Sequence, residues 1–235
     1  MFPNVTEEPA YRDKTFVFRD RLHAAKILAE KLQPYADNPD TIVLAIPAGG
    51  IPVGYVIATR LSVAFDVIVV RKVQLPWDPE AGFGAVAWKG EVILNRPMIE
   101  QLGLSETQIK HAISKASTNV QERVRKFREN RPLPDLQNKK VILADDGLAS
   151  GFTMLAAVKA VKKEKPKEII IAVPTAPMGA TGLLTKEVNL LIALNIRSGP
   201  VFAVADAYKD WHDVSDQEAM MLLKRIWHSQ GYEKA

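Results

Sequence analysis

The segment from Val141 to Met154 constrains the fold of this chain more than any other. It begins with four apolar residues, too few for a helix but enough for a buried strand, and continues with two adjacent carboxylates, Asp145 and Asp146. A loop of small and hydroxyl residues follows, and apolar residues then recur at helical spacing. This order predicts a strand, a ligand-binding turn and a helix in succession.

The chemistry of this turn suits a phosphorylated sugar. Backbone N–H groups at the start of a helix attract a phosphate, because the helix dipole is positive there. Carboxylates at the strand end can accept hydrogen bonds from sugar hydroxyls, or hold a hydrated metal ion through water. An acidic pair alone is more often an ordinary solvated strand end, so the hypothesis depends on the pair and the loop occurring together.

Short apolar runs alternate with helical patterns along the rest of the chain. Further buried strands are expected at Thr41–Ile46, Phe65–Val70, Ile169–Val173 and Leu190–Leu194, and helices at Phe16–Leu32, Val53–Leu61 and Ser105–Asn130. The alternation predicts an α/β fold with a mostly parallel sheet of about five strands flanked by helices. We expect residues 1–235 to form a single domain.

Composition excludes several classes of site and partner. The chain has no cysteine, which rules out disulfides, thiolate zinc sites and a cysteine nucleophile. Its net charge of +4 is mild, which fits an anionic small molecule and gives no reason to expect a nucleic-acid partner. The four histidines show no metal-ligand spacing. No apolar leader or membrane-length run is seen, so we expect a cytoplasmic protein without a membrane partner.

Ligands of parallel sheets bind at the carboxyl ends of the strands. Four loops are expected there, at Ala48, Lys72, Asp145 and Thr175, and they can converge on one site. The Pro47–Gly50 turn contains two glycines, which permit the close approach of an anion. Arg71 precedes Lys72 at the end of the second strand, so two cations would face the same site, although a basic pair on the surface is the alternative.

The Asp145–Thr153 segment resembles the phosphoribosyl-pyrophosphate (PRPP) signature of type I phosphoribosyltransferases, in which a small-residue loop ending in Thr-Gly-x-Thr follows two acidic residues. Ser150 stands where threonine is commoner and keeps a hydroxyl. The likeness extends from about residue 18 to residue 222, through Phe18–Arg21, Ile46–Gly54 and Val214–Asp216, to a set of little-characterised prokaryotic proteins with a phosphoribosyltransferase domain.

The resemblance implies a type I phosphoribosyltransferase fold with a helical insertion at about 99–130 and a small hood from residues 83–94, 196–235 or both. It implies a Mg²⁺-dependent enzyme that transfers a phosphoribosyl group from PRPP to a nitrogenous base and releases pyrophosphate. A homodimer is also implied. The Val73–Gly84 loop would be a mobile lid over the reaction.

Roles for individual residues follow from the same resemblance. Asp145, Asp146, Arg71 and Lys72 would be catalytic, with Mg²⁺ held mainly by PRPP and water. The 5′-phosphate would bind Gly147, Ala149, Ser150, Gly151, Phe152 and Thr153, and the pyrophosphate would bind Ala48, Gly49, Gly50, Arg71 and Lys72.

The acceptor base stays open. Residues 201–206 faintly resemble the base-binding strand end of 6-oxopurine phosphoribosyltransferases, which makes Phe202, Asp206 and Trp211 candidates for contacting a base, with core aromatics as the alternative for the two rings. Those enzymes carry an aspartate where this chain has Ala149, and a lysine on the following strand that residues 169–177 lack. These two differences oppose a 6-oxopurine acceptor.

One departure from the resemblance supports a different function. The relatives usually read Pro-Arg-Gly-Gly in the first loop, whereas this chain has Ala48 in place of the arginine. The alternative is therefore a non-catalytic regulator of the same fold that binds PRPP or a nucleotide. For the long charged helix at 105–130 we expect a solvated helix docked by one apolar stripe, with a dimer or partner surface as the alternative. A sugar-phosphate hydrolase has no supporting nucleophile or metal cluster in the sequence.

Overall fold

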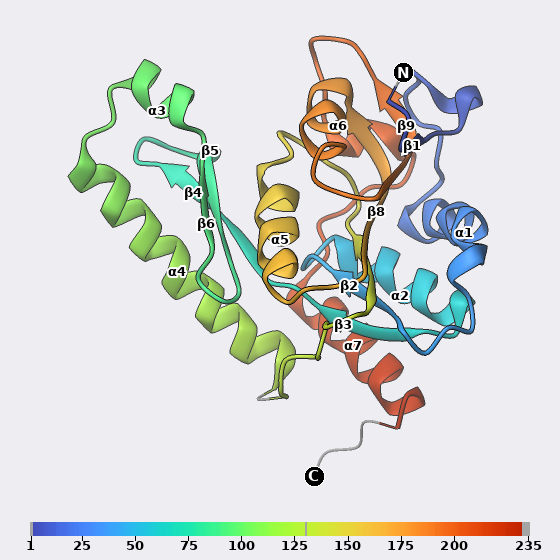
Figure 1. Ribbon diagram of the computed structural model, residues 1–235. Helices are drawn as coiled ribbons and strands as arrows, with labels where there is room; N and C mark the ends of the chain where they lie inside the picture. Colours follow the sequence, from blue (N-terminus) through green and yellow to red (C-terminus); the bar gives the residue numbers. More distant parts are fainter. Residues whose placement is uncertain (1, 130, 232–235) are drawn as a thin grey trace.

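A six-stranded parallel sheet forms the centre of the computed structural model, which describes residues 2–129 and 131–231 (Figure 1). The strands lie in the order β1-β9-β8-β7-β2-β3. They are β1 (Val5–Thr6), β2 (Thr41–Ala45), β3 (Ala64–Val67), β7 (Lys140–Ala144), β8 (Glu168–Pro177) and β9 (Leu190–Arg197). The α/β fold with a parallel sheet is confirmed. The additional strand, β1, has two residues and is too short to leave a periodic pattern.

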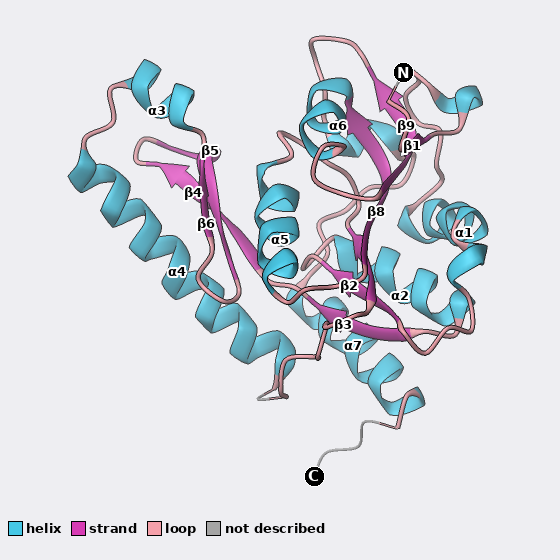
Figure 2. Ribbon diagram, in the orientation of Figure 1, coloured by secondary structure: helices cyan, strands magenta, loops and turns pink. Residues whose placement is uncertain are grey.

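Helices cover both faces of this sheet (Figure 2). These helices are α1 (Arg21–Lys31), α2 (Gly50–Leu61), α5 (Phe152–Lys163), α6 (Met178–Leu184) and α7 (Asp216–Ser229). Two others, α3 (Arg96–Leu102) and α4 (Glu106–Arg128), pack against a second sheet. Alternate strand residues point to opposite faces, so Val43 and Ile142 pack with α1, α2 and α7, whereas Leu44 and Val141 pack with α5. Burial on both faces explains why these strands read as continuous apolar runs.

A second, antiparallel sheet lies beside the first and carries the insertion. It consists of β4 (Val70–Leu75), β5 (Asp78–Ala87) and β6 (Val92–Leu94), in that order, and α4 packs against it (Figure 1). The expected strand over 65–70 is wrong at its end, because β3 stops at Val67 and the chain then enters the other sheet. The expected Val73–Gly84 loop is also wrong: these residues form a β-hairpin in which Val73 pairs with Gly84. Strands β5 and β6 form a second hairpin, which turns at Lys89 and Gly90.

Helix α4 docks as expected by one stripe of apolar side chains. Its capping box of Ser105 and Gln108 is present, and the helix ends at Arg128, while Asn130 lies outside the described residues. Ala116 and Val120 on the stripe are buried with the second sheet. Apolar residues at helical spacing keep the same face of α4 turned toward the sheet along its length.

Two helices begin at other residues than expected, and their actual starts place residues at the site. The helix expected over 16–32 begins only at Arg21, because the Asp20 side chain accepts the His23 N–H at 2.7 Å and caps it. Helix α2 begins at Gly50 rather than Val53. Arg21 therefore occupies the first turn of α1, beside the sheet. No helix in the described ranges combines the length and apolar character that crossing a membrane requires.

Candidate active site

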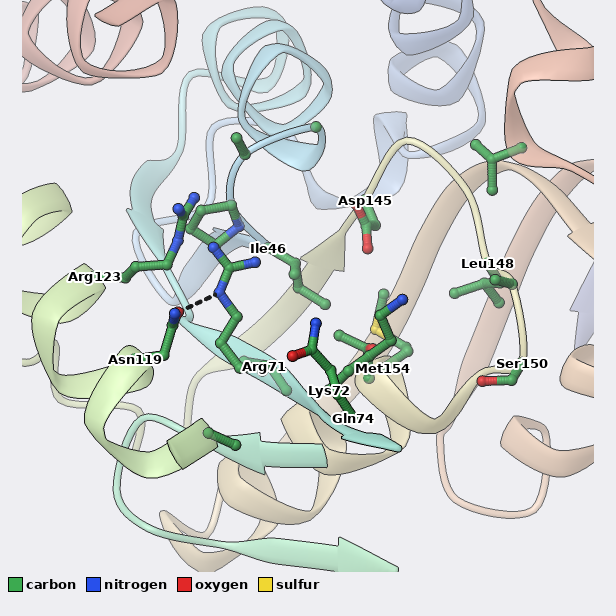
Figure 3. Close-up of a pocket in the computed structure, with 18 of the residues that line it drawn as sticks. Ile46, Arg71, Lys72, Gln74, Asn119, Arg123, Asp145, Leu148, Ser150 and Met154 are labelled. Carbon is green, nitrogen blue, oxygen red and sulfur yellow. Dashed lines mark hydrogen bonds between the residues drawn. The ribbon is translucent and has the colours of Figure 1, made fainter. Parts of the chain in front are cut away.

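A cavity of about 1160 Å³ opens where the turns after β2 and β7 meet the second sheet and α4 (Figure 3). The cavity brings together these residues predicted for the site: Ala48, Gly49, Arg71, Lys72, Asp145, Asp146, Gly147, Ala149, Ser150, Gly151, Thr153 and Trp211. Four other predicted residues are absent from its lining: Gly50, Phe152, Phe202 and Asp206. Segments far apart in the sequence thus converge on one cavity.

The turn after β7 has the form of an anion-binding loop. Gly151 adopts a left-handed conformation (φ 83°) directly before α5, whose first N–H groups have no acceptor within the helix. Gly147 has no room for a side chain, because a Cβ there would lie 2.5 Å from Val204. The Leu148 N–H donates to the Thr175 carbonyl at 2.9 Å, which ties the turn to β8.

The fourth expected loop, at Thr175, is wrong. Strand β8 continues to Pro177, so Thr175 lies within it, fully buried, and its hydroxyl hydrogen-bonds to Asn195 at 2.7 Å. The extension pairs with β9 as far as Arg197. Thr175 supports the turn after β7 through its backbone carbonyl and does not line the cavity.

The two adjacent carboxylates have different partners. The Asp146 carboxylate accepts a hydrogen bond from the Arg21 Nε–H at 2.8 Å, and Arg21 also donates to the His212 carbonyl at 2.7 Å. The Arg21 guanidinium lies 3.8 Å from the centre of the Trp211 ring, which faces the same cavity. Asp145 instead accepts the backbone N–H of Asp146 at 2.9 Å. Asp146 is thus held in a network, and Asp145 is the carboxylate left to meet a ligand.

The same contrast appears in their ionisation. Burial raises the pKa of Asp145 well above that of a free aspartate, and the neighbouring charge of Asp146 raises it further. Burial also raises the pKa of Asp146, but the Arg21 cation opposes this shift. Asp145 is therefore the first of the pair to take up a proton, and a ligand that donates hydrogen bonds to it would favour its charged form.

The Gly49–Gly50 turn packs directly on the acidic pair. A Cβ on Gly49 would lie 2.1 Å from the Asp146 carboxylate, and one on Gly50 would lie 2.7 Å from the Ala144 carbonyl. Only glycine allows the turn to approach so closely. The turn after β2 and the acidic pair after β7 consequently form one surface.

If the cavity binds PRPP, as the sequence resemblance implies, a Gly49→Ala variant should bind it more weakly, because the new methyl group must push the Asp146 carboxylate away from Arg21. Losing this charge-assisted hydrogen bond should weaken binding about tenfold. Isothermal titration with PRPP measures the effect. Gly179→Ala is the matched control, since a Cβ there meets nothing within 4 Å; equal affinity in the two variants would contradict the packing argument.

A cationic wall on β4 and α4 faces the loops. The Arg71 Nε donates to Asn119 at 2.9 Å, and Figure 3 shows the guanidinium groups of Arg71 and Arg123 beside one another. Burial lowers the pKa of Arg71 to about 10, and the nearby Arg123 cation contributes. His111 and Lys115 line the cavity from the same helix. Arg71 and Lys72 lie within a strand of the second sheet, not at the end of a core strand as expected.

Sequence reasoning missed the cavity-lining face of α4. His111, Lys115, Asn119 and Arg123 recur every four residues, which places them along one face of a helix. That face was expected to be solvated, and His111, Lys115 and Asn119 are exposed as expected, but the four residues also line the cavity. The spacing was visible in the sequence, but no pattern indicated what the face would meet.

The aromatic and acidic candidates for base contact separate in the structure. Phe202 packs against the Arg197 guanidinium, 5.4 Å from its ring centre, and Asp206 pairs with Arg197 at 3.2 Å, away from the cavity lining. Trp211 and the unpredicted Val204 do line it. The segment 196–235 therefore supplies part of the cavity wall, whereas residues 83–94 supply none of it.

A pre-formed metal site is not evident in the described ranges 2–129 and 131–231. No group of three or more histidine, aspartate or glutamate side chains gathers there as metal ligands. The acidic pair is the nearest approach to one, and two carboxylates alone hold Mg²⁺ only with the help of a ligand or water.

Comparisons with known proteins agree with this geometry. The family model described as the phosphoribosyl transferase domain matches residues 85–197, which include the whole turn after β7. The crystal structure of the protein TT1426 from Thermus thermophilus is 32% identical, with a TM-score of 0.72 over 88% of this chain and 98% of that one. The chain belongs to the phosphoribosyltransferase family.

Other members of the family are more distant. A Mycobacterium tuberculosis protein provisionally named a phosphoribosyl transferase is 29% identical over 89% of this chain, and the chain spans about half (47%) of that relative's length. A purine phosphoribosyltransferase from Pyrococcus horikoshii is 20% identical, with a TM-score of 0.44 over 81% of this chain and 99% of that one. The parallel sheet with its flanking helices is the type I phosphoribosyltransferase fold of the family.

Proposed function

We propose that this phosphoribosyltransferase uses PRPP as donor and replaces its pyrophosphate with a nitrogenous base. The observation that carries the proposal is the convergence of three groups on one cavity: the anion-binding turn 147–153, the acidic pair, and the Gly49–Gly50 turn packed on that pair. A donor with a phosphate, a ribose and a pyrophosphate needs all three.

Each part of the donor then has its own contacts. The 5′-phosphate binds the turn before α5 through backbone N–H groups and the hydroxyls of Ser150 and Thr153. The ribose hydroxyls donate to Asp145 and Asp146, and the pyrophosphate lies on the Gly49–Gly50 turn facing Arg71 and Lys72. In the reaction the bond from C1 to the pyrophosphate oxygen breaks, the electron pair stays on that oxygen, and the acceptor nitrogen bonds to C1 and loses its proton to water.

The chain stabilises both charges that develop. Positive charge grows on the ribose, where the acidic pair lies, and negative charge grows on the leaving pyrophosphate, where the cationic wall lies. The cavity offers too few oxygen ligands to hold Mg²⁺ alone, so the substrate would have to share its coordination. The acidic pair would contact Mg²⁺ through water, and the pyrophosphate would supply the remaining ligands. Bound in this way, Mg²⁺ would offset the charge of the pyrophosphate.

For the acceptor we propose the wall made by Trp211 and Val204. Trp211 is held in place by the Arg21 guanidinium and by Tyr208, whose ring centre is 5.2 Å away. A rigid aromatic ring is a suitable surface for a base. Phe202 and Asp206, which lie outside the cavity lining, are not part of this proposal. A homodimer stays a prediction, which light scattering in solution can check.

Ala48 favours a second candidate, a regulator that binds PRPP or a nucleotide without turnover. The first loop lacks the arginine that its relatives carry, and with it one cation for the leaving group. Release of pyrophosphate from PRPP, measured with a panel of purine and pyrimidine bases, separates the two. Release with any one base supports transfer. PRPP binding without release across the panel supports the regulator, and absence of PRPP binding contradicts both.

A further inference from the structure

The cavity lining includes a guanidinium from helix α4, that of Arg123, whereas the first loop has no arginine. Arg123 of α4 lines the same cavity as Ala48 and Gly49, although it follows them by some 75 residues in the sequence. In Figure 3 the Arg71 guanidinium lies between Arg123 of the helix and Ile46, which begins the turn.

The structure fixes both guanidinium groups in place. Asn119 accepts the Nε–H of Arg71 at 2.9 Å, and Asp216 of α7 pairs with Arg123 at 3.3 Å. The Arg123 guanidinium also lies 4.7 Å from the centre of the Phe127 ring. Arginines held by hydrogen bonds and packing lose little entropy on binding an anion. This arrangement resembles a prepared binding site more than a solvated surface.

The charge of this pair is incompletely balanced. Burial lowers the pKa of both Arg71 and Arg123, and the charge of Arg123 lowers that of Arg71 further. Asp216 is the carboxylate that opposes them, and Lys126 shares it at 2.5 Å. The Nε of Arg123 is buried without a hydrogen-bond partner in the described part of the chain. A multiply charged anion between the two arginines would relieve their repulsion and take up donors.

We infer that Arg123, held by Asp216, binds the pyrophosphate group of the donor together with Arg71 and replaces the arginine absent from position 48. The inference rests on the proposed function, and it assigns to α4 a direct part in the reaction. The guanidinium fork fits two phosphate oxygens, so Arg123 would stabilise the negative charge that grows on the leaving pyrophosphate.

The test measures binding rather than turnover. Isothermal titration with inorganic pyrophosphate and, separately, with ribose 5-phosphate is applied to the wild type and to Arg123→Ala. We expect the affinity for pyrophosphate to fall about tenfold or more while the affinity for ribose 5-phosphate changes less than about twofold. Unchanged pyrophosphate affinity would overturn the inference.

Two control variants separate binding from folding. Asp216→Asn breaks the same ion pair but leaves the cation, so it should retain pyrophosphate affinity; an equal loss there would show that Arg123 acts only through the fold. Lys115→Ala, two turns away on the same face, should have the smaller effect. Adding Ala48→Arg to Arg123→Ala should recover the affinity for pyrophosphate. A double variant that binds as weakly as Arg123→Ala would contradict the inference that Arg123 takes the place of an arginine at position 48.

Failure of the inference is distinct from failure of the proposed function. If the wild type binds neither ribose 5-phosphate nor PRPP, the proposed function is wrong and the inference is wrong with it. If the wild type binds both and Arg123→Ala binds pyrophosphate normally, the proposed function stands and only the role of Arg123 is refuted.

Discussion

An Asp145→Asn variant should be more stable than the wild type at pH 7, whereas Asp146→Asn, one residue later, should be less stable. Burial and the neighbouring carboxylate raise the pKa of Asp145, so its charged form costs free energy in the folded protein. Asparagine removes that cost and can still accept the Asp146 N–H. Asp146 is the partner of the buried Arg21, and its loss leaves that cation without a carboxylate.

The pH dependence gives the sign of the first effect. A carboxyl whose pKa is raised by folding stabilises the folded state at low pH, and this contribution is lost as the pH rises from the unfolded pKa through the folded one. The advantage of Asp145→Asn should therefore be small near pH 4 and grow toward neutral pH. Each unit of pKa corresponds to about 1.4 kcal/mol, or a shift in melting temperature of roughly 3–5 °C for a chain of this size.

The second effect should be opposite in sign: burial raises the pKa of Asp146 too, but its replacement leaves the buried Arg21 cation without its carboxylate. Breaking a buried ion pair costs about 3–5 kcal/mol, and the remaining contacts of Arg21 with the His212 carbonyl and Trp211 place this case near the lower value. Thermal melts followed by circular dichroism between pH 4 and pH 8 measure both variants. Asp210→Asn, at an exposed position, is the control and should change little. Shifts of the same sign at Asp145 and Asp146 would contradict the assignment.

Under the proposed function both variants should also release pyrophosphate about 10²–10³ times more slowly, because each removes a carboxylate from the site of growing positive charge. Asp145→Asn would then be more stable and less active than the wild type. Such a trade-off is expected where a buried charge is kept for chemistry rather than for folding.

Arg128→Met should destabilise the protein by about 3–5 kcal/mol, without any contact with the cavity. Arg128 is the largest fully buried side chain, and it pairs with the buried Asp66 at 2.5 Å at the end of α4. It also donates to the Pro132 carbonyl and lies over the Trp88 ring at 5.7 Å. Its loss leaves the Asp66 carboxylate buried and unpaired. Urea denaturation measures the change in the free energy of unfolding.

Two further variants test the reason for this effect. Adding Asp66→Asn to Arg128→Met removes the orphaned charge and should recover part of the stability. Arg125→Met, three residues earlier and exposed, should change it by less than about 0.5 kcal/mol. If the double variant is no more stable than Arg128→Met, packing rather than the ion pair explains the loss. Because Asp66 belongs to β3, this pair fixes the end of α4 to the main sheet.

Local patterns in the sequence were sufficient to find the turns after β2 and β7, which form the side of the cavity that we propose binds the donor. The strand, acidic pair and small-residue turn at 141–153 are contiguous, so short-range chemistry places their backbone groups together whatever the rest of the chain does. The Pro47–Gly50 turn was found for the same reason. Boundaries were less well predicted: the capping by Asp20 was not used, and the start of α1 was placed too early.

The acceptor side could not be found in this way. Arg21 meets Asp146 across 125 residues of sequence, and the α4 face meets β4 and the first loop only because the second sheet carries it there. Helical spacing shows which side chains share a face, but not what that face contacts. The resemblance favoured Phe202 over Trp211 as the aromatic neighbour of a base, and only the packing shows that Trp211 lines the cavity while Phe202 lies against Arg197.

By itself the sequence determined the α/β class, the family and the small-residue turn that we propose for a phosphorylated ligand, because these depend on hydrophobic period and on residues adjacent in the chain. Only the tertiary structure decided which cations face that turn, which carboxylate is paired and which aromatic ring lines the cavity. Those properties depend on burial and on distances between distant segments, and the free energy of a charge is set by both.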